Sequence, residues 1–138
     1  MCYYYTTFSA LTITYNIFSG YTLNIINEAT DEASDSLLLN VDDKTTIPSI
    51  LCTSNSELQI NLTWARSTGD GSLPNGVMQS YEFIPGRQQV RLTWNRKSIA
   101  SDSGVYSCTG EDNLGDKDEV QLILFTSSKC SCKYNKRT

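Results

Sequence analysis

The stretch Asp102-Ser103-Gly104-Val105-Tyr106-Ser107-Cys108 decides the fold, and it has the form Asp-x-Gly-x-Tyr-x-Cys. Upstream of it lie Cys52 and, twelve residues later, Trp64. Glycine suits a turn that needs a positive φ, and an aspartate side chain can bond to nearby backbone. We therefore predict a tight turn at Asp102 and Gly104, followed by a strand over residues 105–110.

This order and spacing of a cysteine, a tryptophan and a Tyr-x-Cys pair resembles the immunoglobulin superfamily over about residues 37–125. The resemblance implies an all-β fold, an immunoglobulin-like two-sheet Greek-key sandwich with poorly ordered terminal extensions. It implies a disulfide between Cys52 and Cys108 that bridges the sheets. The core signature that it implies consists of Trp64, Leu92, Asp102, Gly104 and Tyr106, with Trp64 packed on the bridge and the Tyr106 hydroxyl bonded to main chain.

Alternation of apolar and polar residues predicts the strands, because successive side chains of a strand point to opposite faces. We expect strands over residues 37–41, 46–53, 60–66, 78–84, 90–94, 105–110 and 119–125. Pro48 cannot donate to a ladder, so it indicates an edge or a bulge in the second strand. Leu92 lies one residue further from Asp102 than is usual in the family, which predicts a bulge or longer loop at 95–98 with Ile99 filling the corner.

The domain division that we predict is an N-terminal extension and linker (1–36), an Ig-like domain (37–126) and a C-terminal tail (127–138). Residues 21–26 alternate enough to be a stray strand at the end of a preceding module, and the acidic segment 28–36 is typical of a linker. The first 27 residues contain no lysine or arginine and no continuous apolar run, so they do not form a clear signal peptide. No segment resembles a membrane span. We expect the chain to be part of a longer receptor or secreted protein.

Composition argues against several classes of function. The net charge of -4 does not indicate a nucleic-acid surface, and the chain has no histidine, the usual general base and commonest metal ligand. We find no nucleophile elbow and no phosphate-binding loop, so we expect neither an enzyme nor a cofactor. Acidic residues crowd the last predicted hairpin, but their spacing does not match a calcium loop, and we expect a solvated loop without metal there.

The five cysteines leave three outside the predicted bridge, namely Cys2, Cys130 and Cys132. One residue separates Cys130 from Cys132, whereas most zinc or redox pairs have two. An unpaired tail is the plain interpretation. An interchain bond and a pairing with another domain remain open.

The resemblance is closest to the intermediate (I) set of the superfamily, with a short variable-like domain as the second choice. Fifty-five residues separate Cys52 from Cys108, which leaves little room for both extra strands of a variable domain. The I-set typically shows Cys-x-Ala-x-Asn-x-x-Gly. Here Gly110 and Asp112 replace the alanine and asparagine, and Gly115 matches.

Two functions follow from this resemblance. The first is an extracellular or cell-surface recognition and adhesion module that binds another protein, either a ligand or a homophilic Ig-like partner. The second is an intracellular structural domain of the kind found in muscle and cytoskeletal proteins. Asn61-Leu62-Thr63 is the only Asn-x-Ser/Thr sequon in the chain and favours the first, with Asn61 as the glycan acceptor.

A common binding mode of the family uses the outer face of the sheet that contains the last two strands. Alternation places six residues there: Asn61, Thr63, Ser107, Thr109, Ile123 and Phe125. If Asn61 is bare, we expect contact through Ile123 and Phe125. If it is glycosylated, which we favour, we expect this face to be partly covered and binding to move to charged groups. Those are the acids Glu111, Asp112 and Asp116, or the basic residues Arg87, Arg91, Arg96 and Lys97.

Overall fold

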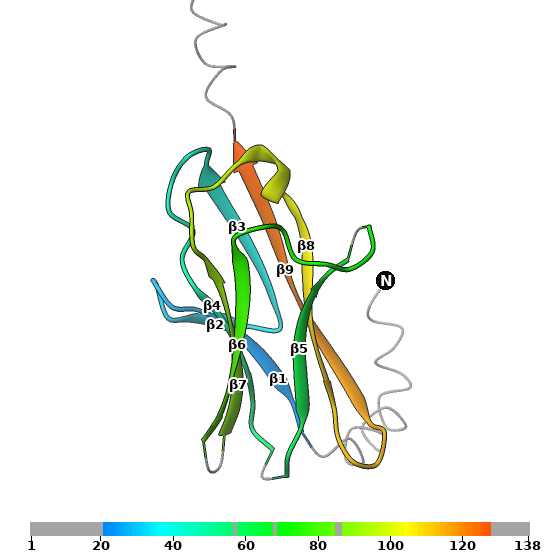
Figure 1. The fold of residues 1–138 in the computed structure, drawn as a ribbon. Coiled ribbons are helices and arrows are strands. Elements are labelled where there is room, and N and C mark those ends of the chain that lie inside the picture. Colours follow the sequence, from blue (N-terminus) through cyan, green and yellow to red (C-terminus); the bar gives the residue numbers. More distant parts are fainter. Residues whose placement is uncertain (1–20, 57, 68, 85–86, 128–138) are drawn as a thin grey trace, which may run out of the picture.

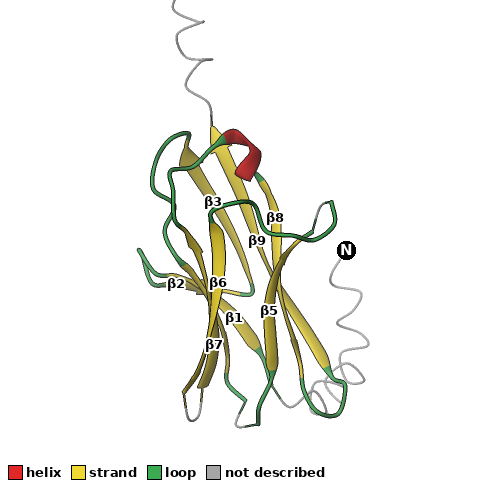
Figure 2. Cartoon of the chain, viewed as in Figure 1, coloured by secondary structure: helices red, strands yellow, loops and turns green. Residues whose placement is uncertain are grey.

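The computed structural model describes residues 21–56, 58–67, 69–84 and 87–127, which form two packed β-sheets (Figure 1). The first sheet, in the order β2-β1-β4-β7-β6, consists of Glu32–Ser34, Leu23–Asn27, Ile50–Ser54, Arg87–Trp94 and Val77–Ile84. The second, in the order β3-β9-β8-β5, consists of Ser36–Asp42, Lys117–Ser127, Gly104–Glu111 and Asn61–Arg66. A single 3₁₀ turn, η1 (Ala100–Asp102), interrupts the strands of this region (Figure 2). The expected all-β sandwich is confirmed.

The core lies between the sheets and follows the predicted alternation. Ile50 and Cys52 on β4 and Leu92 on β7 are completely buried, and they face Tyr106 and Cys108 on β8. On the central strands every second residue enters this layer, so the pattern in the sequence fixes which face is inside. Strand β4, which we predicted over residues 46–53, begins at Ile50, after Pro48. Proline cannot supply the ladder hydrogen bond that an earlier start would need.

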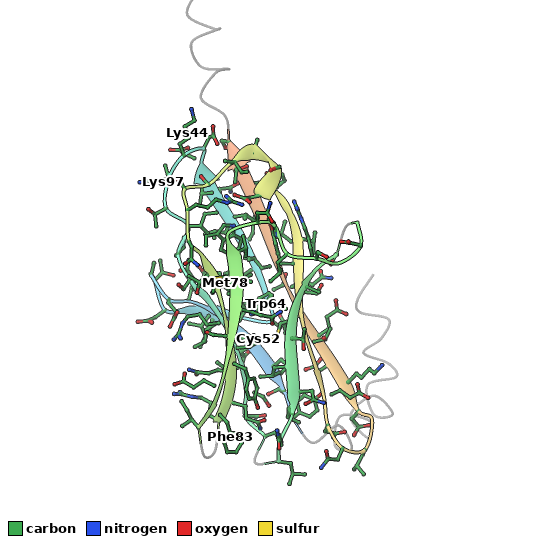
Figure 3. The ribbon with its side chains drawn as sticks, viewed as in Figure 1. Lys44, Cys52, Trp64, Met78, Phe83 and Lys97 are labelled. Carbon is green, nitrogen blue, oxygen red and sulfur yellow. A yellow bond between two sulfur atoms is a disulfide. The ribbon has the colours of Figure 1, made fainter. Side chains whose placement is uncertain are left out.

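The bridge between the sheets is present as a disulfide between Cys52 and Cys108. The Trp64 side chain is 1% exposed, and its indole N–H donates to the carbonyl oxygen of Val90 at 3.1 Å (Figure 3). Because Trp64 belongs to β5 and Val90 to β7, this bond joins one sheet to the other. Burial of the large ring is therefore achieved without leaving its polar atom unpaired.

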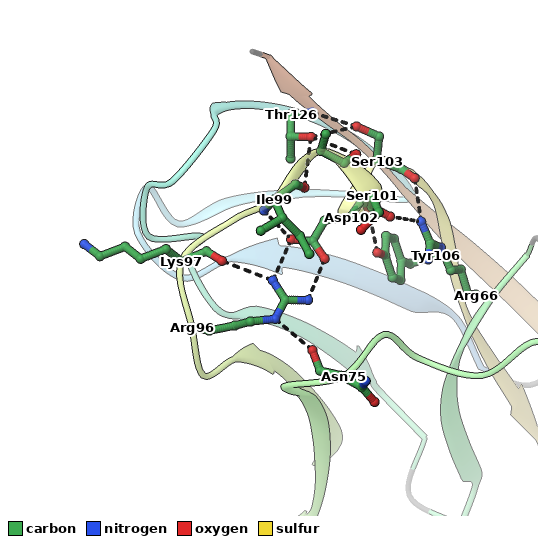
Figure 4. Close-up of polar contacts among 11 residues, drawn as sticks. Arg66, Asn75, Arg96, Lys97, Ile99, Ser101, Asp102, Ser103, Tyr106 and Thr126 are labelled. Carbon is green, nitrogen blue, oxygen red and sulfur yellow. Dashed lines mark hydrogen bonds and ion pairs between the residues drawn. The ribbon is translucent and has the colours of Figure 1, made fainter. Parts of the chain in front are cut away.

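The corner between β7 and β8 is organised by Asp102 (Figure 4). Its backbone carbonyl accepts the Tyr106 hydroxyl at 2.7 Å, and its carboxylate accepts two bonds from Arg96 at 2.8 and 2.9 Å and one from the Ile99 N–H at 2.9 Å. Burial alone would raise the pKa of Asp102, but the bonds from Arg96 and Ile99 hold this pKa below its usual value. The prediction that Ile99 fills the corner is wrong, because its side chain is 44% exposed and the charged pair occupies the space.

The strand at residues 21–26 is part of the sandwich, so its assignment to a preceding module is wrong. It forms β1, which pairs antiparallel with β4 so that Ile25 lies opposite Cys52. Leu23 and Ile25 are buried in the same core as the disulfide. The acidic segment that follows is a turn and the short edge strand β2, paired with β1, and is not a free linker. Residues 1–20 and 128–138, with Cys2, Cys130 and Cys132, lie outside the described residues.

The chain then crosses to the second sheet, where β3 pairs in parallel with β9. At the opposite side of this sheet, β5 is the last strand in the described part of the chain. Variable-type domains extend this sheet with two more strands. The described residues show no such extension, in agreement with the short interval between the two bridging cysteines.

Candidate binding face

The outer face of the second sheet carries an apolar patch at one end. The register places Leu38 of β3, Ile123 of β9 and Val105 of β8 side by side on neighbouring strands. Phe125 follows two residues after Ile123 on the same face. Leu38 is 58% exposed and Phe125 is 55% exposed, while Ile123 and Val105 are half-buried between them. We call these four residues the apolar patch.

The other end of the same face is polar and contains the sequon. Asn61 lies opposite Glu111, which in turn lies opposite Lys117. These residues line a shallow depression of about 230 Å³. Its lining consists of Asn61, Thr63, Thr109, Gly110, Glu111 and Lys117. Asn61 and Thr63 both point to solvent, as a glycan acceptor site requires.

The two ends of this face are well separated. Ile123 lies six residues after Lys117 on β9, a distance of roughly 20 Å at about 3.3 Å per residue. A glycan on Asn61 would stand beside Glu111 and the loop that follows it, and far from the apolar patch. This placement argues against the expectation that glycosylation moves binding from Ile123 and Phe125 to the acidic loop, because the attachment point adjoins the loop and not the patch.

The acidic loop between β8 and β9 uses several of its polar groups to order itself. The Asp112 carboxylate accepts the N–H groups of Leu114 and Asp116 at 2.9 and 2.8 Å. The Tyr21 hydroxyl donates to the carbonyl oxygens of Gly110 at 2.8 Å and Asp116 at 3.1 Å. Burial, reinforced by the nearby carboxylates, raises the pKa of Tyr21 to about 12. Asp112 is thus a structural residue of the loop, and Tyr21, which lies just before β1, holds the backbone of the same loop.

The basic residues that were the other candidate do not form one patch. Arg91 makes an ion pair with Glu28 at 2.8 Å, and these bonds lower the pKa of Glu28. Arg96 is bound to the buried Asp102. Two of the four predicted cations are therefore held by carboxylates of the same chain, which weakens them as a site for an acidic partner.

Sequence reasoning missed part of the apolar patch and the burial of one residue on the face. Leu38 belongs to the patch because β3 pairs in parallel with β9, and Val105 because β8 pairs antiparallel with β9. Alternation within one strand reveals neither pairing. The triplet Leu37-Leu38-Leu39 was the available signal, since a strand with three successive leucines must expose one. Ser107 does lie on this face, but it is 7% exposed because the hydroxyl of Ser67 covers it at 2.9 Å.

The described part of the chain contains no group of three or more histidine, cysteine, aspartate or glutamate side chains placed to hold a metal ion. It also contains no helix long and apolar enough to cross a membrane.

Solved structures with the same arrangement share little sequence with this chain. A chain from the complex of Dpr2 Ig1-Ig2 with DIP-Theta Ig1-Ig3 matches 77% of this chain and 32% of its own length, with a TM-score of 0.56 and 16% identity. The BIgI domain of the beta protein from S. agalactiae, bound to CEACAM1, matches 79% of this chain and 98% of its own length, with a TM-score of 0.51 and 10% identity. The titin M3 domain matches 67% and 88%, with a TM-score of 0.50 and 14% identity.

No protein-family model and no curated protein sequence matches the chain. The fold is nevertheless defined by the disulfide, the buried tryptophan, the tyrosine corner and the shared architecture of the solved structures. The chain has the immunoglobulin fold. The expectation drawn from the spacing of Cys52, Trp64 and Cys108 is confirmed in this respect.

Proposed function

We propose that the chain is a non-enzymatic recognition module of an extracellular or cell-surface protein, and that it binds another protein through the apolar patch. The observation that carries this proposal is the exposure of Leu38 and Phe125 on adjacent strands, with Ile123 between them. Contiguous apolar surface on a small domain usually marks a contact. Two of the structural neighbours were solved with protein partners, DIP-Theta and CEACAM1, which supports protein binding as the class of function.

The patch has the composition of an interface centre. Phe125 offers a large exposed ring, and the aliphatic side chains around it are held on three strands of one sheet. Aromatic anchors on a rigid platform contribute most of the affinity in many interfaces, since they lose little conformational entropy on binding. Asn40, Gln121 and Ser36 are the polar neighbours of the patch on β3 and β9, and they would form its rim.

The second candidate is an intracellular structural domain of the I-set type. The titin M3 domain among the neighbours favours it, and its fold match covers most of that domain. The two proposals differ in the oxidation state of Cys52 and Cys108 in protein taken from its own source. A bridged pair favours the extracellular module, and two free thiols favour the intracellular domain.

The binding proposal is tested by screening a multimer of the chain against a panel of displayed ectodomains. Each candidate is then retested with the Leu38→Asp variant, whose exposed position tolerates a charge without disturbing the core. We expect at least one ligand that the wild type binds and Leu38→Asp does not. Ligands that bind both proteins equally would place recognition on another surface and contradict the proposal.

A further inference from the structure

A second surface, distinct from the apolar patch, lies at the edge of the first sheet. Strand β6 is the outer strand of that sheet, and in the described part of the chain it pairs with β7 alone. Six consecutive residues of it, Met78 to Phe83, are exposed. The strand reads VMQSYEFI, with one charge, no lysine and no proline. Natural proteins normally shorten, charge or cover such an edge, because its free backbone groups pair with other strands.

Two other edge strands, β2 in the same sheet and β5 in the opposite sheet, are protected in ways that β6 is not. The opposite edge of the same sheet is β2, a strand of three residues that begins with Glu32 and lies beside Asp31 and Asp35. The edge of β5 is covered by side chains. The Gln79 amide exchanges two hydrogen bonds with the backbone of Trp64, at 2.8 and 3.1 Å, in the manner of a neighbouring strand.

Just before β5, side chains also bond to the backbone of Ile60. Its N–H donates to the Gln88 side chain at 2.6 Å, and its carbonyl oxygen accepts the Tyr81 hydroxyl at 3.4 Å. Side chains of β6 and β7 thus close the edge of β5. The backbone edge of β6 itself has no comparable cover among the described residues.

The orientation of the backbone groups of β6 follows from one hydrogen bond. The Asn95 N–H donates to the Gly76 carbonyl oxygen at 2.8 Å, so Gly76 faces β7. Antiparallel ladders alternate, and every second residue after Gly76 therefore bonds to β7 while the residues between them face outward. The residues with outward N–H and C=O groups are Gln79, Tyr81 and Phe83, while the N–H of Val77 donates to the carbonyl oxygen of Pro74 at 3.1 Å.

The aromatic side chains of β6 are also exposed to solvent. Tyr81 and Phe83 alternate with Gln79, whose side chain turns toward Trp64, so they lie on the inner face of the sheet. They are nevertheless 44% and 55% exposed, because β5 ends the opposite sheet and no described strand covers them. Met78, on the outer face, is 56% exposed (Figure 3).

We propose that β6 is a self-association edge, where a second copy of this chain adds its own β6 antiparallel and extends the sheet across a two-fold axis at Tyr81. This register pairs Tyr81 with its symmetry mate and Gln79 with Phe83 on the inner face, so four exposed aromatic rings meet. On the outer face it pairs Met78 with Ile84 and Ser80 with Glu82. Like charges do not face one another, and aromatic cross-strand pairs are favourable.

We expect a second copy and not an unrelated strand at this edge, because the sequence of β6 is complementary to itself. A two-fold interface requires that one patch match itself, and this strand does so with apolar, aromatic and neutral polar pairs. The association also stops at two copies. Each copy uses β6, the only long edge of that sheet among the described residues, and presents the short acidic β2 at the other side. The expected product is a dimer and not a fibre.

The test is sedimentation velocity of the full chain across a concentration series, with Phe83→Lys and the matched control Phe125→Lys. Both phenylalanines are 55% exposed, and they lie on different sheets. We expect the wild type and the control to dimerise, and Phe83→Lys to weaken the dimer at least about tenfold. A wild type that stays monomeric up to about 100 μM would overturn the proposal.

A second variant keeps the proposal testable if the first one disturbs folding. Phe83→Pro removes an N–H that faces the open edge, so it spares the ladder with β7. It is expected to abolish the dimer while the thermal midpoint stays near that of the wild type. A dimer that survives both Phe83 variants but is lost in Phe125→Lys would move the contact to the apolar patch. That result would contradict the edge and leave the proposed function standing.

Discussion

The hydroxyl of Tyr21 donates to the carbonyl oxygen of Gly110 at 2.8 Å, and this bond joins the segment just before β1 to the end of β8. Tyr21 is 5% exposed, and its hydroxyl also reaches the carbonyl oxygen of Asp116 in the loop after β8. The residues that lead into β1 therefore support the loop at the polar end of the face. This relationship places residues 21–27 within the functional domain and makes their contribution measurable.

Replacing Tyr21 by phenylalanine should lower the free energy of unfolding by about 1–2 kcal/mol, because the buried carbonyl oxygen of Gly110 and the partly buried one of Asp116 lose their donor. The measurement is urea unfolding followed by tryptophan fluorescence. Tyr81→Phe is the matched control, since its hydroxyl lies at a more exposed position, and it should cost less. Equal losses in the two variants would mean that Tyr21 does not anchor the loop.

Trp64→Ala should be the most damaging truncation in the core, with a loss of about 3–5 kcal/mol. The ring is almost completely buried beside the disulfide, and its N–H joins the two sheets through Val90. Because small domains are stable by only about 5–15 kcal/mol, this variant should be partly or wholly unfolded. Circular dichroism during denaturant titration measures it. A variant as stable as the wild type would contradict the assignment of Trp64 to the centre of the core.

Alkaline pH should destabilise the fold through its buried tyrosines. Burial raises the pKa of Tyr106 to about 12, against an ordinary value of about 10 in the unfolded chain. A raised folded pKa contributes stability that is complete below pH ~10 and is lost as pH rises toward ~12, up to about 2–3 kcal/mol for a fully buried group. Urea midpoints at about pH 8 and pH 11 should therefore differ. Tyr106→Phe should show a smaller difference, and an equal one would exclude Tyr106 as the cause.

The core could be predicted from the sequence because it depends on short spacings. Cys52, Trp64 and Cys108 define the bridge and its packing, and alternation around them sets the inward faces of β4, β5, β7 and β8. These features require no knowledge of which distant strands are neighbours. The expected sandwich follows from them directly.

The features that the sequence did not predict depend on contacts between segments that are far apart in the chain. The strand at 21–26 looked isolated, because an acidic segment separates it from the rest and its pairing with β4 spans that segment. The sequence predicts Ile99 in the corner, yet the pair Arg96–Asp102 fills it, since a buried carboxylate with several donors can replace an apolar side chain. The apolar patch required the parallel pairing of β3 with β9.

Asn61→Gln should increase electrophoretic mobility when the chain is secreted from animal cells, because the sequon lies exposed on β5. Treatment of the wild type with a glycosidase should produce the same change. The structure further predicts that the glycan leaves binding through the apolar patch intact, since the two sites lie roughly 20 Å apart along β9. Identical mobilities of untreated wild type and variant would show that Asn61 is not modified.

The most direct test of the binding face compares the affinities of two charge substitutions for one protein ligand. Phe125→Asp places a charge in the apolar patch, and Leu114→Asp places the same charge in the loop between β8 and β9, where Leu114 is 85% exposed. We predict that Phe125→Asp weakens binding at least about tenfold and that Leu114→Asp changes it less than about twofold, with both variants folded and bridged. Loss of binding in Leu114→Asp with full affinity in Phe125→Asp would place recognition on the acidic loop and contradict this account.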